Sequence, residues 1–344
     1  MKVDVMTGGR SLRSMQEFAR ATKAAGFSGL VLTETGRTAY LACAAAALAE
    51  PELHLSTGVA VAFPRSPMIT ASTAWELAEA SGGRFRLGLG TQVRAHIERR
   101  FGTEFDPPGP RLEDYVLAVR ACFAGFRGEP FNFEGRFTKM SLLPKAWSPG
   151  PIGVPDPAID IAAVGTWMLR MAGRVADGVH VHPINTDPYL RGTVLDEVAR
   201  GRAEAGRPEG AVQLIVPTFT VVGDTPEEQQ RWREMARQQV SFYGSTPNYA
   251  FIFEQIGHPD TTSRIRERQK AGDLAGMAAV VTDDILDHFV VTATWDGLAD
   301  ALIARYGGVA ERVVLYYGAA MFDRDPRDYG RLGEVARAVV AHGG

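Results

Sequence analysis

The first ninety residues alternate short apolar runs with segments of helical spacing, and this limits the possible folds more than any other feature of the chain. Repeated strand-then-helix units make successive strands parallel, with right-handed crossovers between them. Such a chain forms either a closed barrel or an open doubly wound sheet. The four apolar runs predicted to be strands are Val3–Met6, Gly29–Thr33, Leu53–Phe63 and Phe85–Leu89.

The remainder of the chain supplies four more predicted strands, which favours the barrel. Eight parallel-type strands over 344 residues suit a (β/α)₈ fold in a single domain, residues 1–344, because no repeat or linker interrupts it. Pro217 predicts a bulge or a strand end. Residues 241–300 contain no convincing strand and are predicted to be a helical insertion, and Gly128–Met140 a loop or hairpin. The four later strands are Ala158–Ala163, Gly178–His182, Val212–Val222 and Val313–Tyr317.

Composition excludes several classes of protein. A formal net charge of −3 offers no basic field for nucleic acid. No apolar run approaches the length of a membrane span, and the N-terminal run is too short for a secretory signal. Cys43 and Cys122 both lie in Ala-rich helical stretches, which indicates buried thiols rather than a disulfide or a metal site. We therefore expect a cytoplasmic protein.

Several segments, taken in order, resemble the luciferase-like monooxygenase superfamily, and more narrowly its branch that uses the deazaflavin coenzyme F420. The resemblance implies a barrel of the bacterial-luciferase type and an oxidoreductase that acts on a small-molecule substrate. Relatives of this kind are often dimers, so a homodimer is a further expectation. The segments that carry the resemblance are VAVAFPRSP (59–67), GRFRLGLGT (83–91), AAVGTWMLRMAGRVADGVHVHP (162–183) and RVVLYYG (312–318).

The resemblance places a cofactor at the carboxyl ends of the strands, where barrel active sites lie. Glycines at 88 and 90 would let a planar ring approach the backbone, although glycine can also merely relieve crowding inside a barrel. Gly165 and Thr166 open a helix whose N–H groups suit a phosphate, although Thr166 could be an ordinary N-cap. The predicted cofactor contacts are Gly58, Val59, Ala60, Gly88, Gly90, Thr91, Ala163, Val164, Gly165 and Thr166.

In the resembling family, a non-prolyl cis peptide follows the third strand and backs the ring of the cofactor. Gly58, Val59 and Ala60 are the matching positions. A cis bond between such residues costs roughly 3 kcal/mol and persists only where the surroundings enforce it. We expect one within this segment.

The chain departs from the sugar-phosphate dehydrogenases of the F420 branch, and their activity is not expected here. Those enzymes end the second strand in Asp-His, where this chain has Glu34 and Thr35. Val93 stands where they carry an acidic residue. Glu34 remains an acid/base candidate or ring contact. Its alternative roles are to cap the following helix or to pair with Arg37.

Histidines are the other candidates for polar contacts or proton transfer. His96 matches a cofactor-contacting Asn of the dehydrogenases, in a loop where Arg94 could simply be solvated. His180 and His182 share one strand face, but no third ligand with suitable spacing predicts a metal. We expect one of them to face the barrel mouth, and the predicted catalytic residues are Glu34, His96 and His182.

Three functions remain open. The first is F420-dependent hydride transfer to or from a small organic substrate, with the substrate side lined by Tyr249, Phe251 and Phe253 of the insertion. The second is an FMN-dependent monooxygenase of the luciferase type. The third is a non-catalytic cofactor-binding barrel, to which the missing His and acidic residue lend weight.

Overall fold

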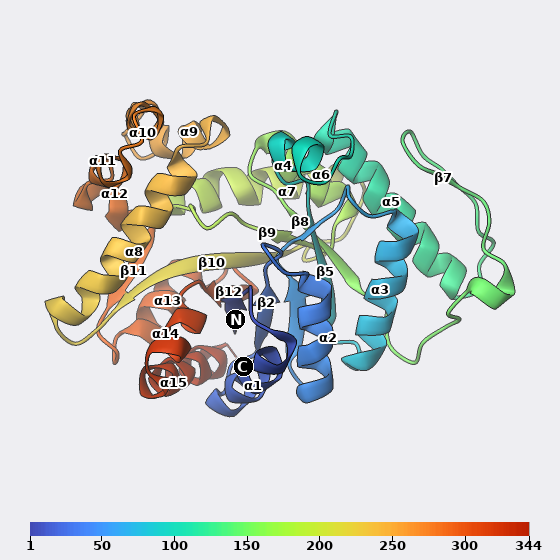
Figure 1. The fold of residues 1–344 in the computed structure, drawn as a ribbon, viewed down its shortest axis with the longest axis horizontal. Helices are drawn as coiled ribbons and strands as arrows, with labels where there is room; N and C mark the ends of the chain where they lie inside the picture. Colours follow the sequence, from blue (N-terminus) through green and yellow to red (C-terminus); the bar gives the residue numbers. More distant parts are fainter. Residues whose placement is uncertain (344) are drawn as a thin grey trace.

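Eight parallel strand positions close into a barrel in the computed structural model, which describes residues 1–343 (Figure 1). Strand β9 pairs with β10, β10 with β12 and β12 with β1, so the sheet has no open edge in the barrel. The predicted (β/α)₈ fold is confirmed. Its strands are β1 (Lys2–Thr7), β2 (Gly29–Leu32), β3 (His54–Thr57) with β4 (Ala60–Val61), β5 (Phe85–Gly90), β8 (Ala158–Ala162), β9 (Gly178–His180), β10 (Gln213–Val222) and β12 (Arg312–Leu315).

Helices surround the barrel, and local sequence sets their ends. Helix α1 begins after Ser11, whose side chain accepts a hydrogen bond from the Ser14 N–H, and ends at Gly26 with φ 98°. The surrounding helices are α1 (Leu12–Ala25), α2 (Ala39–Ala49), α3 (Pro67–Ala80), α4 (Arg94–Arg99), α5 (Pro108–Phe126), α6 (Thr166–Val175), α7 (Leu195–Glu204) after the π-helical turn η2 (Tyr189–Val194), α8 (Pro226–Gly244), α13 (Leu298–Tyr306), α14 (Gly318–Arg324) and α15 (Pro326–His342).

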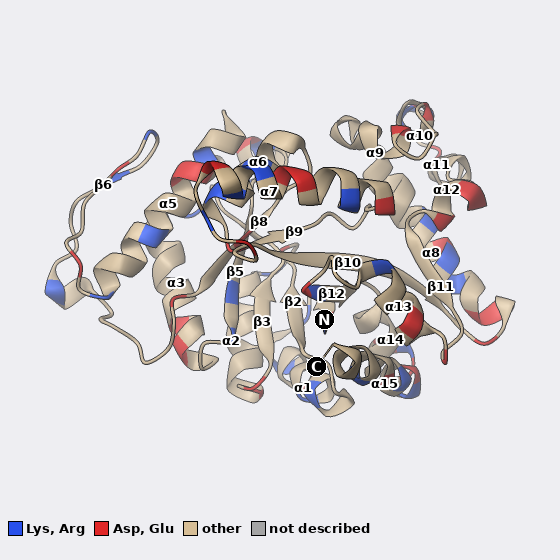
Figure 2. Ribbon diagram, turned by 180° about the vertical axis from the view of Figure 1, so that it is seen from behind, with Lys and Arg blue, Asp and Glu red and all other residues tan. Residues whose placement is uncertain are grey.

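Charged residues are unevenly distributed over these helices. Helix α7 carries both signs along its length, whereas α2 carries no charged residue (Figure 2). No helix within residues 1–343 combines the length and apolar character that a membrane crossing requires.

The third strand position is broken where the sequence analysis predicted a cis peptide. Strands β3 and β4 are separated by Gly58 and Val59, and the peptide bond between these two residues is cis. The prediction is confirmed. Strand β3 pairs with both β2 and β5, while β4 pairs only with the end of β5. The break therefore lies at the carboxyl end of the barrel.

Two expectations about the second half of the chain are wrong. Residues 241–300 contain a strand, β11 (Val290–Ala293), which pairs in parallel with Phe219–Val222 at the end of β10. Pro217 neither ends nor bulges β10, because it pairs in register with Val314 and the strand continues to Val222. Strand β10 is long enough to pair with the barrel first and with β11 beyond it.

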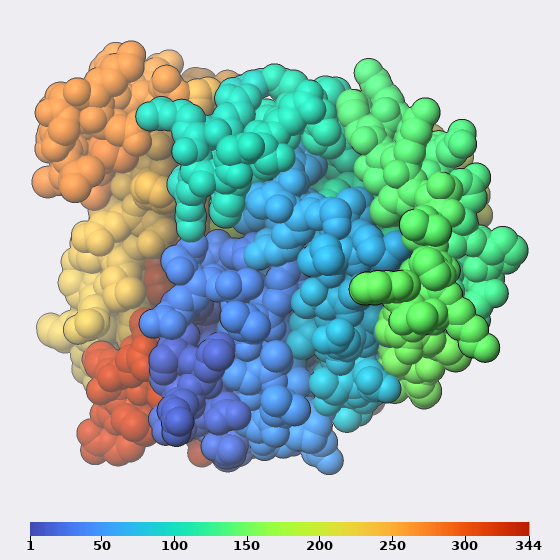
Figure 3. All heavy atoms as spheres, turned by 45° about the vertical axis from the view of Figure 1, so that its right-hand side comes forward, coloured from blue at the N-terminus to red at the C-terminus, as the bar shows by residue number. Residues whose placement is uncertain are grey.

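The remainder of the insertion is helical, as predicted. It forms a lobe at the upper edge of the molecule, beside the segment around α4 (Figure 3). The predicted hairpin near Gly128–Met140 is also present, as the antiparallel pair β6 (Phe133–Glu134) and β7 (Lys139–Met140). The insertion contains η3 (Pro247–Tyr249), α9 (Ala250–Glu254), α10 (Thr261–Lys270), α11 (Leu274–Val280) and α12 (Asp283–Asp287).

Candidate functional site

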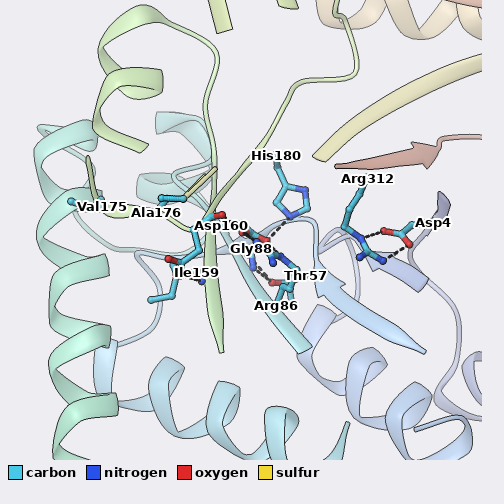
Figure 4. A network of polar contacts seen from close by, with 12 residues as sticks. Asp4, Thr57, Arg86, Gly88, Ile159, Asp160, Val175, Ala176, His180 and Arg312 are labelled. Carbon is cyan, nitrogen blue, oxygen red and sulfur yellow. Dashed lines mark hydrogen bonds and ion pairs between the residues drawn. The ribbon is translucent and has the colours of Figure 1, made fainter. Parts of the chain in front are cut away.

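Two buried ion pairs fill the lower barrel interior, because alternate side chains along each strand point inward (Figure 4). The Arg312 guanidinium donates to both oxygens of Asp4, at 2.6 and 2.7 Å. On the opposite wall, Arg86 donates to both oxygens of Asp160, at 2.8 and 2.5 Å. The Asp160 carboxylate is completely buried. This ionic layer closes the barrel beneath the mouth.

His180 lies inside the barrel directly above the Asp160 carboxylate. Its Nε2 is 3.8 Å from Asp160 Oδ2 and has no hydrogen-bond partner among residues 1–343. Burial lowers the pKa of His180 to about 4, although the nearby Asp160 charge opposes that shift. The ring is therefore neutral near pH 7.

Gly88 packs against this histidine. A Cβ at position 88 would lie 1.9 Å from the Thr57 carbonyl oxygen and 2.7 Å from His180 Nε2. The Gly88 N–H also donates to Thr57 Oγ1 at 2.9 Å, and that hydroxyl donates back to the Gly88 carbonyl at 2.7 Å. The alternative of relieved crowding thus explains Gly88, and its contact with a cofactor remains a prediction.

Glu34 holds the segment that follows the cis peptide. Its Oε2 accepts from the Val61 N–H at 2.8 Å and from Arg65 Nη1 at 2.9 Å, and its Oε1 accepts from Arg65 Nη2 at 2.6 Å. The expected alternatives of pairing with Arg37 or capping a helix are wrong, because Arg65 and the Val61 N–H occupy the carboxylate. With both oxygens occupied, the geometry favours a positioning role over proton transfer.

The glycine at the end of β5 makes room for the cis segment. A Cβ on Gly90 would lie 2.6 Å from Val59 Cγ2, so a larger residue would push Val59 away. Gly58 and Val59 are partly exposed, whereas the side chains of Ala60 and Ala163 are buried. These two alanines therefore expose almost no surface, and their contact with a cofactor remains a prediction. Thr91, partly buried, donates its hydroxyl to the Gln92 carbonyl at 3.1 Å.

Helix α6 presents an open N-terminus at the same end of the barrel. Gly165 is its N-cap residue and Thr166 its first residue, so the alternative of a Thr166 N-cap is wrong. No side chain caps this helix end, both residues are exposed, and a Cβ on Gly165 would meet no atom within 4 Å. Val164, just before them, is partly exposed, and its carbonyl accepts the Tyr189 hydroxyl at 2.8 Å. Free N–H groups with a hydroxyl beside them suit a phosphate.

His182 faces the mouth among tyrosines. Its ring centroid lies 4.7 Å from that of Tyr243 and 4.5 Å from that of Tyr249. Its Nδ1 accepts from the Ile184 N–H at 3.3 Å, so the neutral ring carries its proton on Nε2. The Tyr243 and Tyr316 hydroxyls are 2.9 Å apart. We call the set His182, Tyr243, Tyr249 and Tyr316 the aromatic wall.

His96, Arg94 and Phe253 do not belong to the aromatic wall. His96 is exposed on α4, and its side chain makes no hydrogen bond or ion pair with residues 1–343. Arg94 is exposed as well and pairs with Glu98 and Asp106. Phe253 is wholly buried against Phe289, which removes it from the expected substrate side.

Phe251, the last of the predicted aromatic residues, and Trp167 lie outside the aromatic wall. Phe251 packs on Tyr189, with ring centroids 5.7 Å apart, and Trp167 is 46% exposed over Gly109. Two surface depressions, of about 440 and 210 Å³, lie within the insertion, among η3, α9 and α10, and between α13 and α15. Neither includes the mouth residues described above. Within residues 1–343 no cluster of three His, Cys, Asp or Glu side chains could hold a metal.

Three residues of this site, Arg65, Tyr243 and Tyr316, were not predicted from the sequence. Arg65 lies within the VAVAFPRSP segment that carried the family resemblance, so its charge near a strand end was an available signal. Tyr316 follows the last strand in RVVLYYG and was equally visible. The contact of Tyr316 with Tyr243, 73 positions away, depends on how α8 packs over the barrel.

Residues 1–312 match the family model described as luciferase-like monooxygenase. The chain belongs to this family. Among luciferase-like relatives, a Mycobacterium tuberculosis protein named only as uncharacterized protein Rv1360 is 36% identical over 311 residues, covering 88% of this chain and 92% of its own. A 5,10-methylenetetrahydromethanopterin reductase of Archaeoglobus fulgidus is 26% identical and covers 84% of each chain.

Solved structures show the same luciferase-like fold. The coenzyme F420-dependent tetrahydromethanopterin reductase of Methanopyrus kandleri superposes with a TM-score of 0.80 at 19% identity, covering 99% of both chains. An FMN complex of the oxygenating constituent of 3,6-diketocamphane monooxygenase, from Pseudomonas putida, gives a TM-score of 0.66 at 16% identity and 98% coverage of both. At these identities the structures establish the fold only, and the enzymes among the relatives are oxidoreductases or monooxygenases.

Proposed function

We propose that this protein is a coenzyme F420-dependent oxidoreductase that transfers a hydride between the deazaflavin and a small organic substrate. The observation that carries the proposal is the placement of the cis segment Gly58–Val59 and the open N-terminus of α6 at the same barrel end. The reductase relatives at 26% and 27% identity support F420 over FMN, since the Methanopyrus kandleri reductase is named as F420-dependent. We further propose that residues 1–344 act as one domain.

The residues present fit a phosphate-bearing planar cofactor. Gly165 offers space that a Cβ could enter without meeting another atom, and the first turn of α6 contains no acidic residue that would repel an anion. Val59 and Gly58 are partly exposed and fixed through Glu34 and Val61. Under this proposal, backbone and hydroxyl donors at Gly165 and Thr166 hold the phosphate, and the cis segment backs the ring.

The chain itself contributes positioning and polar contacts. A bound deazaflavin would supply the two-electron hydride chemistry. Hydride at a carbonyl carbon, with a proton at its oxygen, gives the alcohol. The His182 Nε2–H is placed to donate a hydrogen bond to an oxygen that gains charge. Glu34, through Arg65 and Val61, would keep the ring-backing segment in place, and the exposed His96 remains a predicted contact with the cofactor or substrate.

The test is a parallel titration of the purified protein with F420 and FMN, followed by absorbance and fluorescence. We expect F420 to bind more tightly than FMN. The variant Gly165→Asp would introduce a good N-cap carboxylate at the phosphate position and should weaken F420 binding by about tenfold or more. The helix itself should be no less stable, because Asp is favoured at an N-cap.

Gly297→Asp is the matched control, because Gly297 is the N-cap residue of α13, outside the proposed site. It should leave F420 binding unchanged. FMN binding alone would move the assignment to a luciferase-type monooxygenase. Binding of neither cofactor would contradict the proposal, and tight F420 binding without turnover of any acceptor would indicate a non-catalytic binding barrel.

We also propose a homodimer through α2. Leu41 and Leu48 lie two turns apart on this uncharged helix and are 55% and 76% exposed. An apolar patch of this kind can pair with itself across a two-fold axis. Light scattering coupled to size exclusion should show a dimer that the double variant Leu41→Lys, Leu48→Lys converts to monomer. Leu142→Lys, at another exposed leucine, should not do so, and a monomeric parent would contradict the proposal.

The cellular location is likewise a proposal. Cys43 and Cys122 are both free and buried, which suits a reducing compartment such as the cytoplasm.

A further inference from the structure

The aromatic wall faces the inside of the barrel mouth. His180, the last residue of β9, has its ring inside the barrel, and the Val181 N–H still donates to the Ile215 carbonyl, so the alternation continues and turns His182 the same way. Tyr316 lies two residues beyond Val314, which packs with Val31 in the barrel interior. All four side chains of the wall are partly buried. They are therefore packed in place but remain reachable by a ligand.

Within residues 1–343, the hydrogen bonds of the wall leave the His182 Nε2–H, the Tyr249 hydroxyl and a lone pair on the Tyr243 oxygen free. The Tyr243 and Tyr316 hydroxyls share one hydrogen bond of 2.9 Å, in which either hydroxyl can be the donor. The Tyr243 oxygen then keeps a lone pair for another donor. The His182 ring, which contacts Tyr243, carries a free Nε2–H. A hydroxyl group could use both, whereas a carbonyl oxygen could accept from the histidine or from the Tyr249 hydroxyl but has no proton to donate to Tyr243.

The wall carries no charge. Burial alone lowers the pKa of His182 to about 3, and its side chain forms no ion pair with residues 1–343. Burial also raises the pKa values of Tyr243, Tyr249 and Tyr316. An anionic group placed here would lose hydration without gaining a counter-charge, which is unfavourable.

We propose that the aromatic wall is the substrate-binding surface and selects an uncharged alcohol or carbonyl compound with an apolar or aromatic body. This inference rests on the proposed oxidoreductase function and adds the substrate class. His182 and Tyr243 determine the specificity for the reacting oxygen, and the rings of Tyr249 and Tyr316 contact the apolar body.

Binding, rather than turnover, tests the assignment. Isothermal titration of the protein with and without F420 would use three probes: 1-phenylethanol, acetophenone and the anionic 4-acetylbenzoate. We expect both neutral probes to bind at least about tenfold more tightly than 4-acetylbenzoate, since the anion must shed hydration without a cationic partner. Tyr243→Phe should weaken 1-phenylethanol about threefold to tenfold by removing the acceptor, and affect acetophenone less. His182→Phe should weaken both neutral probes.

The control is Tyr329→Phe, which removes a hydroxyl bonded to Thr22 in the contact between α15 and α1. It should change none of the three affinities. Equal or tighter binding of 4-acetylbenzoate overturns the inference, as does unchanged neutral-probe binding in both Tyr243→Phe and His182→Phe. If F420 does not bind but the neutral probes still bind more tightly than 4-acetylbenzoate, the proposed function is rejected, while the aromatic wall remains the substrate-binding surface.

Discussion

The variant Asp160→Asn is expected to lower the free energy of unfolding by about 3–5 kcal/mol. Asp160 is completely buried and receives two hydrogen bonds from Arg86, whose side chain is only 17% exposed. The neutral asparagine side chain of the variant leaves the Arg86 guanidinium charge inside the barrel without its ion-pair partner. Removing one partner of a buried ion pair is costly because the other remains desolvated and unpaired. Urea unfolding, followed by circular dichroism, measures the change.

Two further variants separate the cost of leaving Arg86 unpaired from the cost of removing any carboxylate. Asp187→Asn removes one partner of an exposed pair with Arg191 and should cost no more than about 1 kcal/mol. The double variant Arg86→Met, Asp160→Asn removes the stranded charge as well and should recover much of the lost stability. A small loss for Asp160→Asn, equal to that for Asp187→Asn, would show that the buried pair does not act as described.

Gly88→Ala is expected to destabilise the protein by roughly 3 kcal/mol or more, because its Cβ would meet backbone. The Thr57 carbonyl oxygen would be 1.9 Å away and His180 Nε2 2.7 Å away. The carbonyl belongs to β3, which pairs with strands on both sides and cannot move freely. Overpacking of a filled core usually costs about 1–3 kcal/mol, and a clash with fixed backbone costs more. The unfolding midpoint in urea and Tm report the loss.

Gly330→Ala is the matched control for this substitution. A Cβ at position 330, within α15, meets no atom within 4 Å. Alanine there should be neutral or should stabilise the helix by up to about 1 kcal/mol. If Gly88→Ala were as stable as Gly330→Ala, the close packing between β3 and β5 would be contradicted.

The barrel could be predicted because its strands are local features of the sequence. Runs such as Gly29–Thr33 are apolar on both faces, which is typical of strands covered by helices. Strand β11 was not predicted, because Val290–Ala293 is short and pairs only with the end of β10, a partner some seventy positions away in the sequence. Pro217 was misjudged because the continuity of β10 depends on its pairing with β12 at Pro217 and with β11 beyond it, rather than on the proline alone.

The candidate site was predicted unevenly for the same reason. The cis peptide at Gly58–Val59 followed from a family pattern written in consecutive residues. The ion-pair partner of Glu34 could not be predicted in this way, because Arg65 is 31 positions away and Arg37 is nearer in sequence. Gly88 was predicted as a ring contact without its neighbour His180, which comes from β9, two strands away in the sheet and 92 positions away in the sequence.

The sequence by itself determined the order of the eight barrel strands, the closed parallel architecture and the location of the mouth, because hydrophobic period and glycine position act over a few residues. Only the tertiary structure decided which charges neutralise one another, which histidine is sealed above Asp160 and which meets Tyr243 and Tyr249. Those choices depend on side chains brought together by barrel closure. Desolvation then sets their protonation, because burial is a property of the whole fold rather than of any segment.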